Sequence, residues 1–372
     1  MKKYNYFSLI IVVLFVTCNN DTKNSELLEI PVDIGQNISL SLSEIADEIT
    51  AIELELTDES LINPDYINRI VLCDNYVIIA EQKRIHVFGM DGKFVRSIGS
   101  TGQGPGEYMS IRTVAIDESN KRLFVYSSIS RKLICYNLDG KLIKESFNDQ
   151  QIGIVSDMNY LNGELYLVAE QTREDAKGAL LHSAIYRMND DFQITDSGAI
   201  RAKYGQLIYS PTFYGDHLLY GNSIVYSYYY EPVPPPNFIP DQANAILRDT
   251  LYRLEKNHLL PELKLKLKNN GIDGSGNQVI NLKNIYRSSR YVFAVYYNFV
   301  ESKYYHFCYD TKVRKGYNMQ VGYTDDINKI ENRVIIRPLH SNTEIFYYWH
   351  THMNLDDFEE PNPTLYIGKL KK

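Results

Sequence analysis

Two histidines near the C-terminus have the spacing of a metal site. His350 and His352 are two positions apart, so in a strand their side chains point to the same face. Two histidines and one carboxylate can hold a divalent metal and leave a coordination position open. Asp356 and Asp357 follow closely, but no further ligand stands at a convincing spacing. We therefore expect a polar loop here and no bound metal or other cofactor.

The glycine-rich run at residues 99–108 is the sharpest local motif. A phosphate-binding loop needs Gly-Lys-Ser/Thr at the start of a helix, so that backbone N–H groups point at the phosphate. This run has no such lysine, and Pro105 has no N–H to offer. We expect a structural crossing between sheets, in which glycines adopt positive φ. Glu107 and Tyr108, at the inner end of that crossing, are candidate ligand-binding residues.

Clustered tyrosines precede a proline-rich stretch in the middle of the chain. Tyr228, Tyr229 and Tyr230 are followed by Pro232, beyond which a sheet cannot continue. The sequence predicts a stiff, extended loop. Its tyrosines offer rigid aromatic area that suits sugar rings or a partner protein. The alternative is a decorating loop that follows an edge strand and binds nothing.

The sequence contains no recognisable catalytic constellation. It has no Gly-x-Ser-x-Gly, no His-Glu-x-x-His and no Ser-x-x-Lys with partners in sensible positions. Acidic residues are plentiful, but a glycosidase pair is defined by a three-dimensional separation that sequence does not supply. The net charge of −7, which becomes −9 without Lys2 and Lys3, argues against nucleic acid as a partner.

The elements that must position these residues repeat along the chain. Residues 85–95 predict a strand, an Asp-Gly turn and a second strand, and the same pattern repeats 48 residues later at 133–143. Weaker copies begin at Ile185, Leu251, Phe307 and Leu365. Six copies of one element predict an all-β, six-bladed β-propeller with four-stranded antiparallel blades, which must stack on one another to bury their faces.

The two ends of the chain are expected to share the last blade. Residues 50–56 alternate strictly between apolar and polar side chains, and we expect this strand to pair into blade six. Ahead of it, residues 42–49 favour one short helix with Ser41 or Ser43 as its cap.

Three cysteines lie in the predicted strands. Cys73, Cys135 and Cys308 each sit inside an apolar run, and an odd number cannot all pair. We expect buried free thiols, with one disulfide as the alternative in an oxidising compartment.

These features together resemble a known family. The pattern from Leu42 to Phe147, the glycine-rich crossing and the C-terminal run 362–370 are similar to the six-bladed β-propeller lipoproteins of bacteria, relatives of NHL-repeat propellers. The resemblance covers nearly the whole mature chain and is loosest in the middle. It implies the fold and an envelope location, and almost no biochemistry.

Ligands of six-bladed propellers usually sit over the central channel, where loops lead into the inner strands. By that geometry five charged residues are candidate ligand contacts, because each stands just ahead of an inner strand or at its start. They are Asp65, Arg69, Arg112, Asp157 and Arg287. The alternative for each of them is a solvated loop residue.

The N-terminus is predicted to be an export signal. Lys2 and Lys3 precede an apolar core, Phe7–Val16, whose ten residues span about 15 Å as a helix, half of a bilayer's roughly 30 Å hydrocarbon core. Cys18 follows where the apolar core stops, which resembles a lipoprotein signal with a lipidated cysteine. Several acyl chains on that residue would anchor the chain stably. Ordinary signal cleavage next to an unrelated cysteine is the alternative.

The sequence therefore predicts a signal peptide at 1–17, a flexible tether at 18–26 and a propeller domain at 27–372. We expect a protein lipid-anchored to the cell envelope, at the outer membrane, that acts as a non-enzymatic binding or scaffold module. Its partner would be a glycan, a peptide or a membrane protein. One alternative is a propeller enzyme, a lyase or hydrolase of carbohydrate or peptide that uses the channel. The other is a structural accessory of an uptake complex.

Overall fold

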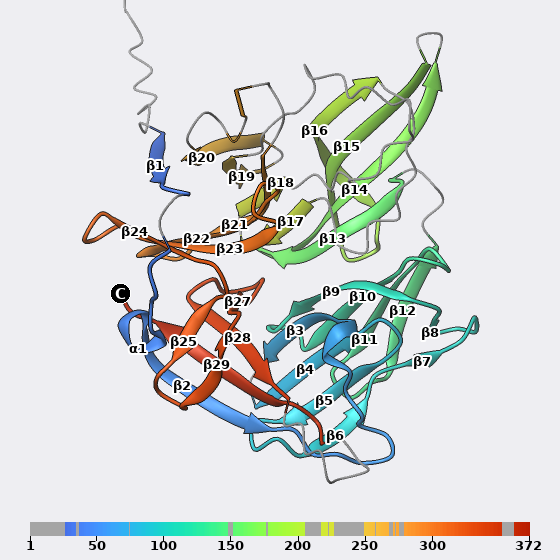
Figure 1. Ribbon diagram of the computed structural model, residues 1–372. Coiled ribbons are helices and arrows are strands. Elements are labelled where there is room, and N and C mark those ends of the chain that lie inside the picture. The colour runs from blue at the N-terminus through green and yellow to red at the C-terminus, as the bar shows by residue number, and fades with distance from the viewer. Residues whose placement is uncertain are drawn as a thin grey trace, which may run out of the picture.

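The alternating apolar runs of the sequence form strands, and the strands form six sheets arranged in a ring (Figure 1). Each sheet is one blade of a six-bladed β-propeller, as predicted. The computed structural model describes residues 27–34, 37–73, 75–147, 152–175, 178–204, 217–221, 223–226, 249–256, 258–267, 271, 273–274, 279–351 and 361–372.

The first three blades follow one another along the chain, each as an antiparallel sheet in sequence order. Blade 1 consists of β3 (Ile67–Cys73), β4 (Tyr76–Glu81), β5 (Ile85–Gly89) and β6 (Phe94–Ser97). Blade 2 consists of β9 (Ile111–Asp117), β10 (Arg122–Ser127), β11 (Lys132–Asn137) and β12 (Leu142–Phe147). Blade 3 consists of β13 (Ile154–Leu161), β14 (Glu164–Asp175), β15 (Gly178–Met188) and β16 (Ile194–Tyr204).

The N-terminal segment contributes to the other half of the ring, in blades 4 and 6. Blade 4 consists of β17 (His217–Tyr220), β18 (Ser223–Tyr226), β19 (Thr250–Glu255) and β20 (His258–Leu267), with β1 (Leu28–Val32) as a fifth, parallel strand. Blade 5 consists of β21 (Ile280–Arg287), β22 (Tyr291–Asn298), β23 (Lys303–Asp310) and β24 (Lys315–Met319). Blade 6 consists of β27 (Arg337–Pro338), β28 (Ile345–His350), β29 (Thr364–Leu370) and β2 (Ala46–Glu53).

Short elements join the blades. Two small ladders lie in the connections: β7 (Ser100–Thr101) with β8 (Glu107–Tyr108), and β25 (Tyr323–Asp325) with β26 (Ile330–Val334). A 3₁₀ turn, η1 (Pro64–Tyr66), leads into blade 1. The helix α1 (Leu42–Ile45) is shorter than expected, because Ala46 already begins β2. Within the described ranges, no helix has the length and hydropathy needed to cross a bilayer.

The ends of the ring are closed by strand pairing. β2 pairs antiparallel with β29, from Ala46 opposite Leu370 to Glu53 opposite Thr364. This confirms the predicted shared blade. The Asp-Gly turns are confirmed as well, since Gly92 and Gly140 have φ of 82° and 85°, which a residue with a Cβ adopts only at a cost.

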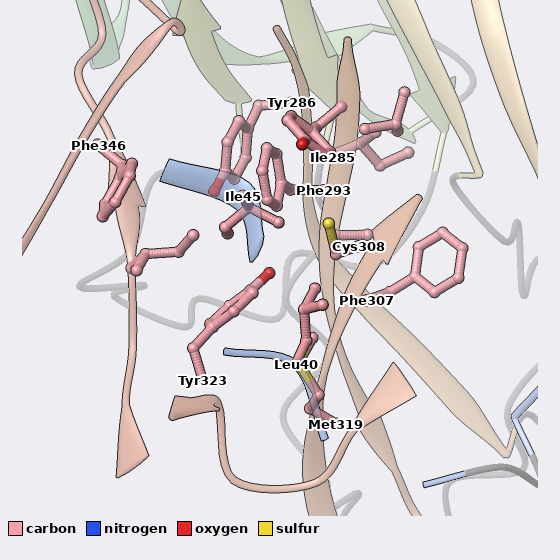
Figure 2. Packing of buried hydrophobic residues seen from close by; sticks show 14 of the residues in the cluster. Leu40, Ile45, Ile285, Tyr286, Phe293, Phe307, Cys308, Met319, Tyr323 and Phe346 are labelled. Atoms are coloured by element: carbon pink, nitrogen blue, oxygen red, sulfur yellow. The ribbon is translucent and has the colours of Figure 1, made fainter. Parts of the chain in front are cut away.

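The hydrophobic core lies between the faces of neighbouring blades. Figure 2 shows part of the cluster between blades 5 and 6, where Ile45 of α1 lies among Phe293, Tyr323 and Phe346. Burying one such side chain stabilises the fold by about 1.5–3 kcal/mol, so the N-terminal segment is an integral part of the propeller.

The predicted strand cysteines are buried. Cys73, Cys135 and Cys308 all lie in the core, and the thiols of Cys135 and Cys308 are free. Burial raises the pKa of the Cys135 thiol to about 11, so this thiol is unreactive at neutral pH.

Candidate functional site

Four of the six inner strands carry a β-bulge at one equivalent position. In β3, β9, β13 and β21 the pairing with the second strand skips one residue: Asn68, Arg112, Ser156 and Lys283 respectively. The positions correspond because the pairing resumes opposite equivalent residues of the second strands, namely Ala80, Tyr126, Val168 and Val295. Each of these residues pairs in turn with the third strand, at Ile85, Leu133, Ile185 and His306.

A bulge leaves one residue unpaired in the ladder and re-aims its side chain. An inner strand pairs on one edge and packs against neighbouring blades on both faces, so its remaining open side is the central channel. Arg112, Ser156 and Lys283 are half-buried and Asn68 is exposed. The four polar residues lie near the start of the inner strands, where Asn68 Nδ2 donates to the carbonyl of Ile111 (2.7 Å) and Ser156 Oγ donates to the carbonyl of Val168 (3.1 Å). We call the face of the disc where the inner strands start the entry face, and these four residues the mouth ring.

Directly below the mouth ring, an ion pair crosses the channel. Arg69 of blade 1 contacts the carboxylate of Asp157 of blade 3, and both residues are almost fully buried. Blades 1 and 3 are not neighbours in the ring, so this contact runs through the centre. Arg69 Nη1 also donates to the backbone carbonyls of Val114 (2.9 Å) and Met158 (2.6 Å).

The carboxylate of Asp157 is saturated by three further donors. Thr113 Oγ1 donates to its Oδ1 atom at 3.0 Å, and the Met158 N–H donates to the same oxygen at 2.8 Å. The N–H of Leu219 in blade 4 donates to Oδ2 at 2.8 Å. One buried network thus ties blades 1 to 4 together, as a buried pair requires if its desolvation is to be offset.

Deeper in the channel, blade 3 is joined to blades 4 and 6. Asn159 Nδ2 donates to the carbonyls of His340 (3.3 Å) and Gly221 (3.4 Å). The rings of Tyr220 and His340 stack with centroids 4.9 Å apart. Burial, together with a smaller contribution from the Arg69 charge, lowers the pKa of His340 to about 3, so this imidazole is neutral at physiological pH. These side chains, with Arg69 and Asp157, form what we call the plug.

The predicted channel residues therefore separate into different environments. Arg69 and Asp157 form the plug, and Arg112 belongs to the mouth ring. Asp65 is exposed in η1, ahead of β3, on the entry face.

One predicted residue lies at the wrong end of its strand. We expected Arg287 ahead of or at the start of an inner strand, but it is the last residue of β21. It therefore lies on the opposite face, where its guanidinium binds Glu262 at 2.9 Å. The error has a physical reason, because residues 280–287 form the inner strand and residues 291–298 form the second one.

The glycine-rich run crosses from blade 1 to blade 2, as predicted. Tyr108 is buried, and its hydroxyl donates to the carbonyl of Ile98 at 2.8 Å. Glu107 accepts a hydrogen bond from the Gly104 N–H at 2.7 Å. Both side chains thus stabilise the crossing itself.

Several predicted sites fall outside the described residues. These are the lipidation site Cys18, the tyrosines Tyr228, Tyr229 and Tyr230, and the histidine His352. His350 ends β28. In the part of the chain that the structure describes, no three His, Cys, Asp or Glu side chains are grouped as metal ligands.

Sequence reasoning missed Asn68, Thr113, Ser156 and Lys283, although a signal for them was present. Each bulge coincides with two consecutive polar residues inside a strand: Asn68-Arg69, Arg112-Thr113, Ser156-Asp157 and Lys283-Asn284. Such a pair breaks the two-residue alternation of a strand. That break marks the bulge.

Comparisons with known proteins agree with this fold. No curated protein matches the sequence. The chain is similar to the solved structure of a candidate exported protein from Bacteroides fragilis, with a TM-score of 0.62 and 16% identity, over 93% of this chain and 100% of that one. It is also similar to a DUF4221-family member from Bacteroides vulgatus, with a TM-score of 0.47 and 12% identity, over 88% and 97% of the two chains.

The family is shown by a match over almost the whole chain. The model of a domain of unknown function, DUF4934, matches residues 26–372. That range includes all six blades and the β1 and β2 strands that tie the N-terminal segment into the ring. The chain belongs to the DUF4934 family.

Proposed function

We propose that this protein is an exported, envelope-anchored binding module that takes its ligand at the mouth ring. The observation that carries the proposal is the bulge repeated at one position in four inner strands. Bulges recur next to functional sites because they re-aim side chains. Here they fall on polar residues near the start of the inner strands of blades 1, 2, 3 and 5.

The plug supports the same proposal. Because the network of Arg69 and Asp157 fills the channel below the mouth ring, a ligand would rest on the entry face instead of passing through. The mouth residues are held on strands of a rigid ring, which positions binding groups more precisely than loops do. Arg112 and Lys283 add positive charge from opposite blades, in a chain whose net charge is −7. A glycan, peptide or membrane-protein partner with acidic groups would suit this mouth.

Affinity capture from envelope extracts tests the proposal. The bait is the full-length protein, compared with an Arg112→Gln/Lys283→Gln variant, and bound glycans and proteins are identified. Lys141→Gln is the matched control, since Lys141 is an exposed cation on the opposite face. We expect wild type and control to capture the same ligand. The double variant should capture less of it, by about tenfold or more. Equal capture by a folded double variant would remove the case for the mouth ring. Turnover of the captured ligand would favour the enzyme alternative.

Export and lipid anchoring are part of the proposal. They are supported by the paired lysines, the short apolar core and Cys18, and by the name of the similar Bacteroides fragilis protein, a candidate exported protein. We expect cells to incorporate labelled palmitate into the wild-type chain and not into Cys18→Ser, which should leave the membrane fraction. Label in the variant, or membrane retention without Cys18, would contradict anchoring at this residue.

A further inference from the structure

A cavity lies on the entry face, away from the mouth ring. Its volume is about 310 Å³, and it opens between blade 1 and the crossing to blade 2. The turn between β4 and β5, the connection from β2 to β3, and the 99–101 part of the crossing form its walls. None of the four mouth-ring residues lines it. Its size is at the lower end of the range for small-molecule sites, so it suits a small ligand rather than a polymer.

Charged side chains of both signs line this cavity. Lys83 and Arg84 line it from the β4–β5 turn, and Asp58 and Glu59 line it from the connection that precedes blade 1. All four side chains are exposed, and within the described residues none of them forms an ion pair or a hydrogen bond. Two cations and two anions thus border one cavity without neutralising one another.

The floor of the cavity is also polar. His86 is fully buried and lines it, with Nδ1 at 3.3 Å from Ser97 Oγ. Its Nε2 atom faces the carboxylate of Glu81 at 3.5 Å. His86 and Ser97 thus add polar side chains to the lining, beside the four charged ones.

We infer that this cavity binds a small zwitterion of the amino-acid type. The carboxylate of such a ligand would lie against Lys83 and Arg84, and its ammonium group against Asp58 and Glu59. A ligand with one charge would be attracted by one wall and repelled by the other. A zwitterion is attracted by both, and its charge-assisted hydrogen bonds are the stronger kind. Polar side chains on the ligand would face His86 and Ser97.

Titration calorimetry and ligand-observed NMR with the full-length protein test the inference. The probes are L-glutamine and the dipeptide Ala-Ala, and the comparison compounds are acetate, methylammonium and glucose. We expect both zwitterions to bind, and the single-charge compounds and the sugar to bind at least about tenfold more weakly. Raising the salt concentration should weaken binding, because the four charges are exposed. Failure of both zwitterions to bind at millimolar concentration would overturn the inference, as would equally tight binding of acetate or methylammonium.

Variants assign the binding to this cavity. Arg84→Gln and Asp58→Asn each remove one exposed charge, so both should fold as the wild type does. Each should raise the dissociation constant for L-glutamine about tenfold. Lys141→Gln and Glu331→Gln, which remove exposed charges elsewhere, are matched controls and should leave it unchanged. Unchanged binding by Arg84→Gln and Asp58→Asn would show that the zwitterion binds at another place. The mouth-ring variant should bind L-glutamine normally, so failure here and failure of the proposed function are distinguishable.

Discussion

At the scale of single residues, the plug holds a buried pair of charged side chains. Arg69 and Asp157 form an ion pair that is withdrawn from water. Desolvating two charges is unfavourable, and here it is offset by their attraction and by backbone and side-chain donors from blades 2, 3 and 4. The network therefore acts less as a source of stability than as a device that fixes the relative positions of blades 1 to 4.

Removing one partner of this pair should be costly. Asp157→Asn leaves the Arg69 guanidinium buried without a counter-charge, and we expect the free energy of unfolding to fall by about 3–5 kcal/mol. Asp139→Asn is the control, because Asp139 is 84% exposed and lies 3.7 Å from Arg96. That change should lower the free energy of unfolding by less than about 1 kcal/mol. Urea unfolding measures both, and similar losses for the two variants would contradict the role assigned to the plug.

A second residue-scale prediction concerns acid stability. Burial raises the pKa of Asp310, but hydrogen bonds from Arg290 and from the N–H groups of Lys312 and Val313 outweigh it and hold this pKa below 3.8. A carboxyl whose pKa is depressed by folding stabilises the fold above its unfolded pKa, and that contribution is lost as pH falls through the folded value.

The measurement is unfolding free energy against pH, from neutral pH to below 3.8. Wild type should lose stability as the pH falls through this range, and Asp310→Asn should lose less over it, because the variant has no proton to bind at that position. Parallel pH profiles for the two proteins would show that Asp310 contributes nothing to the acid transition.

At the scale of elements, the turns and bulges decide how each blade is shaped. The Asp-Gly turns were readable from the sequence, because glycine is the residue that adopts positive φ without strain. The bulges were not, because a bulge is defined by pairing between two strands. One-residue skips at Arg112 and Ser156 follow from how β9 and β13 align with their partners.

Two glycines with the same backbone conformation should respond differently to alanine. Gly92 has φ of 82°, and a Cβ there would lie 1.9 Å from the carbonyl oxygen of Glu53. Gly163 has φ of 86°, and a Cβ would meet nothing within 4 Å. Gly163→Ala should cost about 1–2 kcal/mol from backbone strain alone. Gly92→Ala should cost clearly more, because β2 must move. Thermal unfolding compares them, and equal shifts would contradict the proposed contact.

At the scale of the whole molecule, the N-terminal segment closes the ring. β2 completes blade 6, and β1 adds a strand to blade 4 through Ile30 and Val32, which are buried. Without these strands, β29 and β20 would present unpaired edges and the cluster around Ile45 would lose its cover (Figure 2).

Truncations test this closure. A chain that begins at residue 27 should unfold cooperatively, whereas a chain that begins at residue 57 lacks β1, α1 and β2 and should not. Circular dichroism during urea titration reports cooperativity, with the full-length chain as the reference. A cooperative transition of unchanged midpoint in the shorter chain would show that the ring does not depend on its N-terminal strands.

The sequence by itself determined the number of blades, the Asp-Gly turns and the shared last blade, because alternation and turn chemistry are local and are written in neighbouring residues. Only the tertiary structure decided which polar residues meet. Arg69 and Asp157 are far apart in the chain and join because the ring brings blades 1 and 3 to one axis. Arg287 lies on the other face because it ends its strand, and strand boundaries depend on the pairing between strands. The cavity beside blade 1 arises in the same way, since three connections that are separated by strands border it.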